Sequence, residues 1–391
     1  MKHVYGHITP GWETVRSVFE QNLTDGSDIG AGLCIYHRGI CVVDLTGGWK
    51  DVETKKEPYT LDTLQLVFST SKGIIAAAVA LCVERKWLDY DLPVVQYWPE
   101  FAANGKQNIT VGDLLAHRAG LSFVDEDITV HDAYNWSYMT SLLSLQKPHW
   151  EPGTTHGYHA HTLGYLAGEL IRRVDPSYRS YGQFVRDELD KEFYVGIPND
   201  TVEGRISPLI RKIDTSNIRP SRSQTDKALT CSGAFPIGRP KLIYNDVHFH
   251  RAELPAVNGI TNARSLARIY SLLIGDINEN NHIQTRLVSE DTLNQAIENV
   301  TPKDELDIHS YNMPTIFGKG GFQLFGECFQ IFGDGVFGFT GYGGSCAFAY
   351  PTHQLAYGYV CNHLDPSALN VDPRNLRVIQ AIENILSNQK E

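Results

Sequence analysis

The sequence predicts an α+β fold into which a mostly helical region is inserted. Strand-like segments occur near residues 31–45 and again between residues 322 and 361. Between these two groups, apolar residues recur mainly with helical spacing. There is no internal repeat and no regular alternation of strand and helix. Strands and helices that are segregated along a chain are typical of an α+β fold, and they argue against a βαβ repeat.

The first third of the chain contains a helix, a hairpin and a second, more apolar helix. Residues 11–23 predict an amphipathic helix, because Trp12 and Val15 share its apolar side with Val18 and Phe19. Residues 31–37 and 40–45 are apolar strands separated by Arg38-Gly39, which predicts a tight hairpin turn. A helix that opens at Ser69 is expected to continue to about Lys86 and to end in the turn at 87–93.

The remaining segments are predicted from the same periodicities and from turn residues. Residues 196–258 are rich in Pro, Gly, Ser and Arg and predict long loops. Further helices are expected at 111–117, 161–174, 178–193, 262–273, 289–299 and 375–386. Short strands are expected at 322–325, 328–332, 345–350 and 356–361.

Composition excludes several classes of protein. The 391 residues carry a net charge of −11 without a basic run, which argues against nucleic acid and anionic membrane as partners. Seven scattered cysteines without a C-x-x-C pair argue against a disulfide framework and a zinc site. Without an apolar segment after the N-terminus or a stretch long enough to span a bilayer, we expect a cytoplasmic protein.

The strongest chemical signal is Ser69-Thr70-Ser71-Lys72, followed by an almost wholly apolar run to Leu81. Residues three apart share a helix face, so the Ser69 hydroxyl and the Lys72 amine could meet. A lysine buried in an apolar helix has a lowered pKa and can activate a serine nucleophile. The alternative is a helix cap at Ser69 or Ser71 followed by a solvated lysine, because S-x-x-K also occurs by chance.

Tyr158 is a second candidate, in the loop that leads into the helix at 161–174. If Lys72 lies nearby, its charge is expected to lower the Tyr158 pKa, and the phenol could relay protons. The alternative is an ordinary half-buried tyrosine. His156, His159 and His161 cluster here without a carboxylate or cysteine, so we expect them to hydrogen-bond the loop and not to bind a metal.

A glycine-rich run, Phe337 to Ser345, precedes an apolar strand. Glycines at this density indicate that the backbone approaches something closely, either a ligand or a neighbouring strand. If the partner is a ligand, the backbone N–H of Tyr342 could be an oxyanion donor beside that of Ser69.

These motifs occur in a recognisable order. Ser69-x-x-Lys72, then Tyr158, then Phe339-Thr340-Gly341 resembles the serine β-lactamase and penicillin-binding-protein superfamily, and most of all its class C-like branch with the β-lactamase-related carboxylesterases. Other segments are similar to ones that these proteins share, namely Asp44 to Gly48, Tyr97 to Phe101, Leu114 to Leu121, and Asn258-Gly259.

The resemblance implies an antiparallel sheet domain formed by residues 1–75 and 255–391, and a helical domain formed by residues 76–254. The active site is then expected in the cleft between them. Ser69 would be the acylated nucleophile, Lys72 the base and Tyr158 the proton relay. The strand at Thr340-Gly341-Tyr342 would form one wall of the cleft. These three residues, with Phe339, His159 and Ala160, are the expected oxyanion- and substrate-binding positions.

The chain departs from the superfamily at two positions. Members that cleave lactams and peptides have Tyr-x-Asn, whereas this chain has Tyr158-His159-Ala160. The third motif usually begins with Lys or His, and here it begins with Phe339, which cannot pair with a substrate carboxylate. Four aromatic residues could line an apolar pocket or pack in the core: Tyr134, Trp136, Tyr138 and Trp150.

The sequence therefore predicts a serine hydrolase that cleaves small carboxylic esters without a metal or an organic cofactor. An acyltransferase would use the same acyl-enzyme and remains an alternative. Weak cleavage of β-lactams or D-aminoacyl substrates is a lesser one. A protein that uses this fold only for binding or assembly is the alternative from another class. The sequence does not indicate an oligomeric state.

Overall fold

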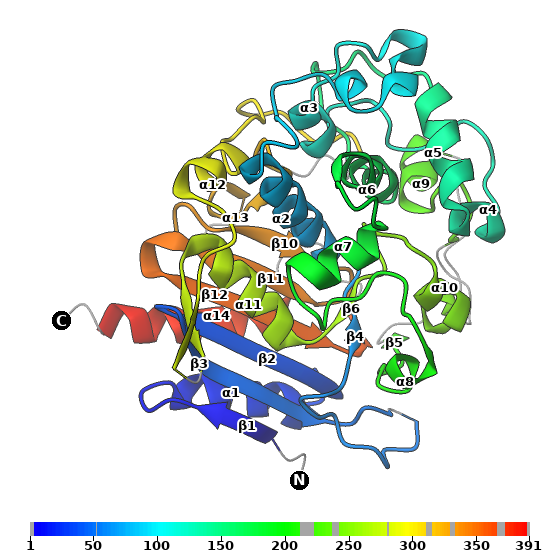
Figure 1. Ribbon diagram of the computed structural model, residues 1–391. Coiled ribbons are helices and arrows are strands. Elements are labelled where there is room, and N and C mark those ends of the chain that lie inside the picture. Colours follow the sequence, from blue (N-terminus) through cyan, green and yellow to red (C-terminus); the bar gives the residue numbers. More distant parts are fainter. Residues whose placement is uncertain are drawn as a thin grey trace.

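The structure is a computed structural model that describes residues 4–51, 53–211, 223–236, 242–279, 281–309, 315–328, 333–365 and 372–388. A seven-stranded sheet forms the lower half of the molecule (Figure 1). In spatial order its strands are β1 (Val4–Ile8), β3 (Ile40–Gly48), β2 (Gly30–His37), β12 (Leu355–Cys361), β11 (Cys346–Tyr350), β10 (Phe337–Thr340) and β9 (Gln323–Leu324). Every neighbouring pair is antiparallel. The predicted α+β fold, with a sheet drawn from both ends of the chain, is confirmed.

Helices cover both faces of this sheet. Side chains alternate along β2, so that Leu33 and Ile35 belong to one apolar cluster while Cys34 and Tyr36 belong to another. The first cluster is closed by α1 (Glu13–Thr24) and α14 (Pro373–Asn388). On the other face, α11 (Ala263–Ile274) contacts the strands, and α2 (Thr70–Glu84) contacts β10 and β11. Burial on both faces explains why the central strands β2 and β12 are largely apolar and do not alternate with polar residues.

The hairpin turn was predicted correctly. Arg38 and Gly39 have φ angles of 52° and 73°, which is the left-handed pair that a two-residue hairpin needs. The α2 helix is buried on nearly all sides, as expected for a helix without a polar face. It leads from the sheet into the upper, helical part of the molecule, where α6 packs beside it (Figure 1).

The inserted region consists mostly of helices. They are α3 (Val111–Leu115), α4 (Val130–Tyr134), α5 (Trp136–Leu145), α6 (Thr162–Val174), α7 (Tyr181–Glu188), α8 (Asp200–Glu203), α9 (Gln224–Leu229) and α10 (Val247–Arg251). The remaining elements are α12 (Glu290–Ala296), α13 (Phe325–Cys328), and the strand pairs β4 (Gln65–Leu66) with β6 (Ile260–Thr261), β5 (Ile210–Arg211) with β13 (His363–Leu364), and β7 (Ile277–Glu279) with β8 (His282–Gln284). One continuous apolar cluster joins residues of the sheet and of the helical region, so the domain boundaries stay a prediction.

Several expected elements differ in the structure. The strand expected at 322–325 is shortened to β9, and Cys328 ends the short helix α13 where a strand was expected, while 329–332 lie outside the described residues. The glycine-rich run contains an unpredicted strand, β10. Gly338 permits this strand, because a Cβ there would lie 2.2 Å from the carbonyl oxygen of Ala347 on β11. The helix expected at 178–193 is the shorter α7, which the side chain of Ser180 caps.

None of the described helices is long and apolar enough to cross a membrane. All seven cysteines are free thiols. Within the described ranges, no group of three or more His, Cys, Asp or Glu side chains is placed to hold a metal ion.

Candidate active site

Ser69 lies in the tight turn between β4 and α2. The preceding residue, Phe68, has a φ of 48°, so the chain reverses sharply just before the helix starts. Two hydrogen bonds hold this turn against the start of β6: the Val67 N–H donates to the Gly259 carbonyl (2.9 Å), and the Gly259 N–H donates to Ser71 Oγ (3.0 Å). Ser71 is therefore buried and its hydroxyl oxygen accepts this hydrogen bond, whereas the hydroxyl of Ser69 at the helix start is half-buried.

The Lys72 amine lies 3.1 Å from Ser69 Oγ, as the spacing on the helix predicted. Its side chain is only 1% exposed. Nζ donates hydrogen bonds to the carbonyl oxygens of Ala160 (2.8 Å) and Ala256 (3.0 Å). Burial lowers the pKa of the Lys72 amine well below its usual range. A neutral amine has two N–H donors, and the two carbonyls accept both of them. The lone pair is then left for the hydroxyl of Ser69.

The Tyr158 hydroxyl donates a hydrogen bond to Ser69 Oγ over 2.7 Å. The three predicted residues therefore meet at Ser69 Oγ. Lys72 Nζ also lies 4.7 Å from the centre of the tyrosine ring. The expectation that Lys72 lowers the pKa of Tyr158 is wrong. Burial raises that pKa, and the hydrogen bond to Ser69 opposes the rise only in part. Tyr158 is therefore a protonated phenol that can donate a proton.

The third motif packs directly against the turn that carries Ser69. A Cβ at Gly341 would lie 2.3 Å from the Val67 carbonyl oxygen and 2.7 Å from Thr70 Oγ1. The close approach that the glycines indicated is therefore made, at this position, to the protein itself. The ring of Tyr342 lies edge-on to Phe68, with 5.5 Å between the ring centres.

The backbone N–H groups of Ser69 and Tyr342 have no hydrogen-bond acceptor among the residues that the structure describes. The neighbouring N–H groups are paired, since Thr70 donates to Val67 and Gly341 donates to Ser345. A polar group left without a partner costs free energy once it is desolvated. These two donors, one on Ser69 itself and one on the segment that packs against its turn, could serve an oxyanion.

Phe339 and Thr340 end the strand β10. The Phe339 ring is 3% exposed and stacks on Tyr158 and on Phe317, with ring centres 6.4 and 6.1 Å apart. Lys72 Nζ lies 6.0 Å from the centre of the same ring. Thr340 is half-buried at the end of the strand. The wall beside the nucleophile is therefore apolar at the position where a cation would bind a carboxylate.

His159 and Ala160 were predicted to bind substrate, and the structure gives each a different place. The fully buried His159 ring accepts from the Leu121 N–H (3.0 Å), and its other nitrogen donates to the Gly157 carbonyl (2.6 Å). Burial lowers the pKa of His159 to about 3. The side chain braces its loop and is not brought to Ser69. Ala160 contributes through its carbonyl, which Lys72 uses.

The other two histidines of this cluster also form hydrogen bonds. His156 contacts Glu305 and Thr315, and His161 contacts the Leu229 carbonyl. Sequence reasoning gave no role to two residues of the site, Ala256 and His117. A backbone acceptor such as the Ala256 carbonyl has no sequence signal. The signal for His117 was its place in the segment Leu114 to Leu121, at the end of the short helix expected at 111–117.

The four aromatic residues proposed for an apolar pocket pack within the helical region. Trp136 donates to Glu169, Tyr138 donates to Glu126, and Trp150 donates to the carbonyl of Thr155. Tyr134 packs against Phe235, and none of the four contacts the Ser69 hydroxyl.

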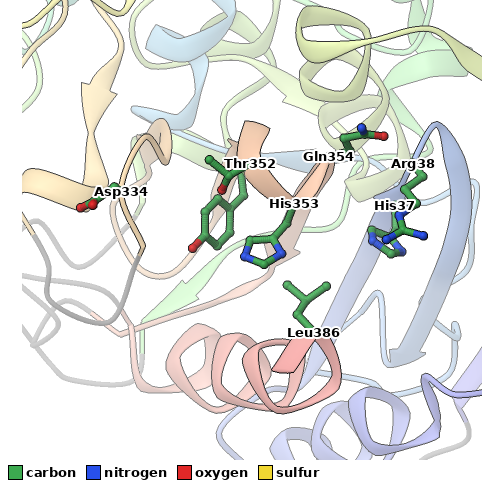
Figure 2. A pocket seen from close by; sticks show the side chains of 8 residues that line it. His37, Arg38, Asp334, Thr352, His353, Gln354 and Leu386 are labelled. Carbon is green, nitrogen blue, oxygen red and sulfur yellow. The ribbon is translucent and has the colours of Figure 1, made fainter. Parts of the chain in front are cut away.

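A cavity of about 450 Å³ lies elsewhere, at the opposite end of β11 (Figure 2). Its wall includes Arg38 from the first hairpin turn, His353 from the turn before β12 and Leu386 from α14. Tyr350 ends β11 in this wall, whereas Cys346 begins β11 opposite Thr340 of the candidate site. The cavity therefore shares no residue with the Ser69 centre.

Comparisons with known proteins find a matching family, a related sequence and similar structures. The beta-lactamase family model matches residues 15–381. The chain is 29% identical to the esterase/beta-lactamase LipL of Mycobacterium tuberculosis, over 93% of this chain and 84% of that protein. It is similar to the structure of EstA from Arthrobacter nitroguajacolicus (TM-score 0.87, 29% identity, all of both chains). It is also similar to a family VIII carboxylesterase (TM-score 0.85, 31% identity, 98% of this chain and all of that one).

Proposed function

Since the chain belongs to the beta-lactamase family, we propose that it is a serine hydrolase that cleaves carboxylic esters through an acyl-enzyme on Ser69. One observation carries the proposal: Ser69 Oγ lies within hydrogen-bond distance of both the Lys72 amine and the Tyr158 phenol. A serine needs such a base nearby, because its own hydroxyl is a weak nucleophile.

Acylation begins when Ser69 Oγ attacks the carbonyl carbon of the ester and its proton passes to the lone pair of Lys72 Nζ. The N–H groups of Ser69 and Tyr342 stabilise the negative charge that develops on the carbonyl oxygen. The C–O bond to the alcohol then breaks, and Tyr158 gives its phenolic proton to the departing alkoxide. The protonated Lys72, which contacts the same oxygen as Tyr158, restores the phenol.

Deacylation repeats these steps with water. Water attacks the acyl carbonyl and gives a proton to the Lys72 and Tyr158 pair. The bond between the acyl group and Ser69 Oγ breaks, the carboxylic acid leaves, and the proton returns to Ser69. Positioned acid–base groups of this kind typically contribute about 10²–10⁴-fold to the rate.

The preference for neutral esters rests on the wall beside Ser69. Phe339 stands where a cation would pair with a substrate carboxylate, and its ring packs on Tyr158. Ala160 has no side-chain amide that could bind the amide of a lactam or peptide. The names of the esterase/beta-lactamase LipL and of the family VIII carboxylesterase agree with ester substrates.

The test is the intact mass of the protein after treatment with a fluorophosphonate probe. Wild type should gain one adduct and Ser69→Ala none, and ester turnover should be lost with the adduct. The exposed Ser137 on α5 offers a matched control, so Ser137→Ala should label as wild type does. Folded wild type without an adduct would favour a binding or assembly role. Transfer of the acyl group to an added alcohol would favour an acyltransferase.

A further inference from the structure

One residue, His117, holds the chain on both sides of Tyr158. The Gly157 N–H donates to the His117 carbonyl oxygen (3.2 Å), and the His159 N–H donates to His117 Nδ1 (3.0 Å). The imidazole also lies against the Tyr158 ring, with 5.1 Å between the ring centres. The Tyr158 N–H donates to Asp307 Oδ1 (3.1 Å). Three successive N–H groups of a segment without regular secondary structure are thus fixed, two of them by His117.

The backbone of His117 adopts a conformation that suits this task. Its φ is 62°, a left-handed value that non-glycine residues rarely adopt and that persists only when the surroundings impose it. The side chain is completely buried, and its ring lies edge-on to Phe317 at 4.5 Å. This turn directs both the carbonyl oxygen and Nδ1 of His117 to the segment that carries Tyr158.

The hydrogen bonds also fix the tautomer of His117. Because Nδ1 accepts from the His159 N–H, the ring proton must be on Nε2. Nε2 is buried without a hydrogen-bond partner among the described residues. Leaving a buried N–H unpaired costs free energy, so the fold tolerates a cost at Nε2 while it keeps Nδ1 as an acceptor.

We propose that His117 is a positioning residue that places the Tyr158 hydroxyl on Ser69 Oγ. The inference rests on the proposed function, because it gives His117 an effect only through the proton that Tyr158 donates. His117 does not touch the substrate or the reacting oxygen. Its loss should therefore misplace Tyr158 while the Ser69 and Lys72 pair remains intact.

The test compares two esters with the same acyl group and different leaving groups. Ethoxide needs a proton from Tyr158, whereas p-nitrophenolate leaves without one. In His117→Leu, kcat/KM for ethyl butyrate should fall by about 10²-fold, the loss expected for a misplaced catalytic group. The value for p-nitrophenyl butyrate should fall far less. His117→Asn should regain most of the loss, because asparagine tolerates a left-handed backbone and its Oδ1 can accept from the His159 N–H.

A double mutant separates positioning from general damage. If His117 acts through Tyr158, adding His117→Leu to Tyr158→Phe should slow ethyl butyrate hydrolysis no further. Equal losses on both esters, or additive losses in the double mutant, would overturn the inference. If His117→Leu does not fold, His117→Gly replaces it, since glycine adopts this φ without strain. The exposed His131 provides the control, and His131→Asn should change neither rate.

The two proposals fail in different ways. If Ser69→Ala or Tyr158→Phe hydrolyses ethyl butyrate as wild type does, the proposed function is wrong. If Tyr158→Phe is slow and His117→Leu is as fast as wild type on ethyl butyrate, only the inference about His117 is wrong.

Discussion

Replacement of Gly341 by alanine tests the proposed oxyanion site without changing Ser69, Lys72 or Tyr158. The added Cβ would lie 2.3 Å from the Val67 carbonyl oxygen and 2.7 Å from Thr70 Oγ1. Ordinary contact begins at 3.4 Å, so the strand end and the turn at Ser69 must separate by about 1.1 Å. One contacted group is a backbone carbonyl in the turn before α2 and the other belongs to the first residue of α2, so neither can swing away as a long side chain would.

The displaced residue after Gly341 is Tyr342, whose N–H we propose as an oxyanion donor. Such donors act at about 2.7–3.1 Å, and loss of one typically lowers kcat by about 10²–10³-fold. We therefore expect Gly341→Ala to lower kcat for p-nitrophenyl butyrate by at least about 10²-fold. The overpacking should also destabilise the fold by about 1–3 kcal/mol. Steady-state kinetics and urea unfolding would measure the two effects.

Gly275 provides the matched control for this substitution. A Cβ at Gly275 would have no heavy atom within 4 Å, and the φ of 179° is open to any residue. Gly275→Ala should therefore leave kcat unchanged. A folded Gly341→Ala variant with the kcat of wild type would refute the reasoning, because Tyr342 could then not be the donor that the packing of Gly341 positions.

Three further predictions concern the base, the relay and the buried charge network. Burial lowers the pKa of Lys72 in the folded protein, so at pH values between that pKa and the unfolded value of about 10.4 the unfolded chain binds one more proton. Within this window, the free energy of unfolding of wild type minus that of Lys72→Met should rise by about 1.4 kcal/mol per pH unit. Urea unfolding at several pH values measures this difference. A difference that does not change with pH would contradict a lowered pKa for Lys72. Tyr158→Phe should lower kcat/KM for ethyl butyrate by about 10²–10⁴-fold. In the double variant with Lys72→Ala, the loss of kcat/KM should be much smaller than the product of the two single losses. A loss equal to that product would count against a shared proton path. Arg374 forms ion pairs with Asp28 and Asp372 within the core. Arg374→Met should therefore lower the free energy of unfolding by about 3–5 kcal/mol. A variant as stable as wild type in urea would show that these ion pairs do not stabilise the fold.

Local patterns predicted the parts of this molecule that depend on local chemistry. The hairpin at Arg38-Gly39 follows from two adjacent residues that can adopt positive φ. The meeting of Ser69 and Lys72 follows from helix spacing alone. The edge strand β1 was not predicted, because it is short, contains Gly6, and keeps most of its side chains exposed.

The rest of the site depends on contacts between distant segments. The pKa of Tyr158 was expected to fall, and it rises because the folded chain buries the phenol away from water. The roles of His117 and the Ala256 carbonyl require the folded arrangement, since each contacts a segment far away in the sequence. His159 was placed in the site by its position in the motif, but the direction of its ring is set by the Leu121 backbone.

Both hydrogen-bond acceptors for Lys72 Nζ are backbone carbonyl oxygens, and this limits which substitutions can change its surroundings. No point substitution at Ala160 or Ala256 deletes a carbonyl oxygen, so mutation cannot readily remove the environment of the base. The side chain at residue 160 is then free to drift between amide-binding and apolar types without loss of the nucleophile. If Ser69 is acylated as we propose, single substitutions at residue 160 can exchange one substrate for another and leave Ser69 and Lys72 in place.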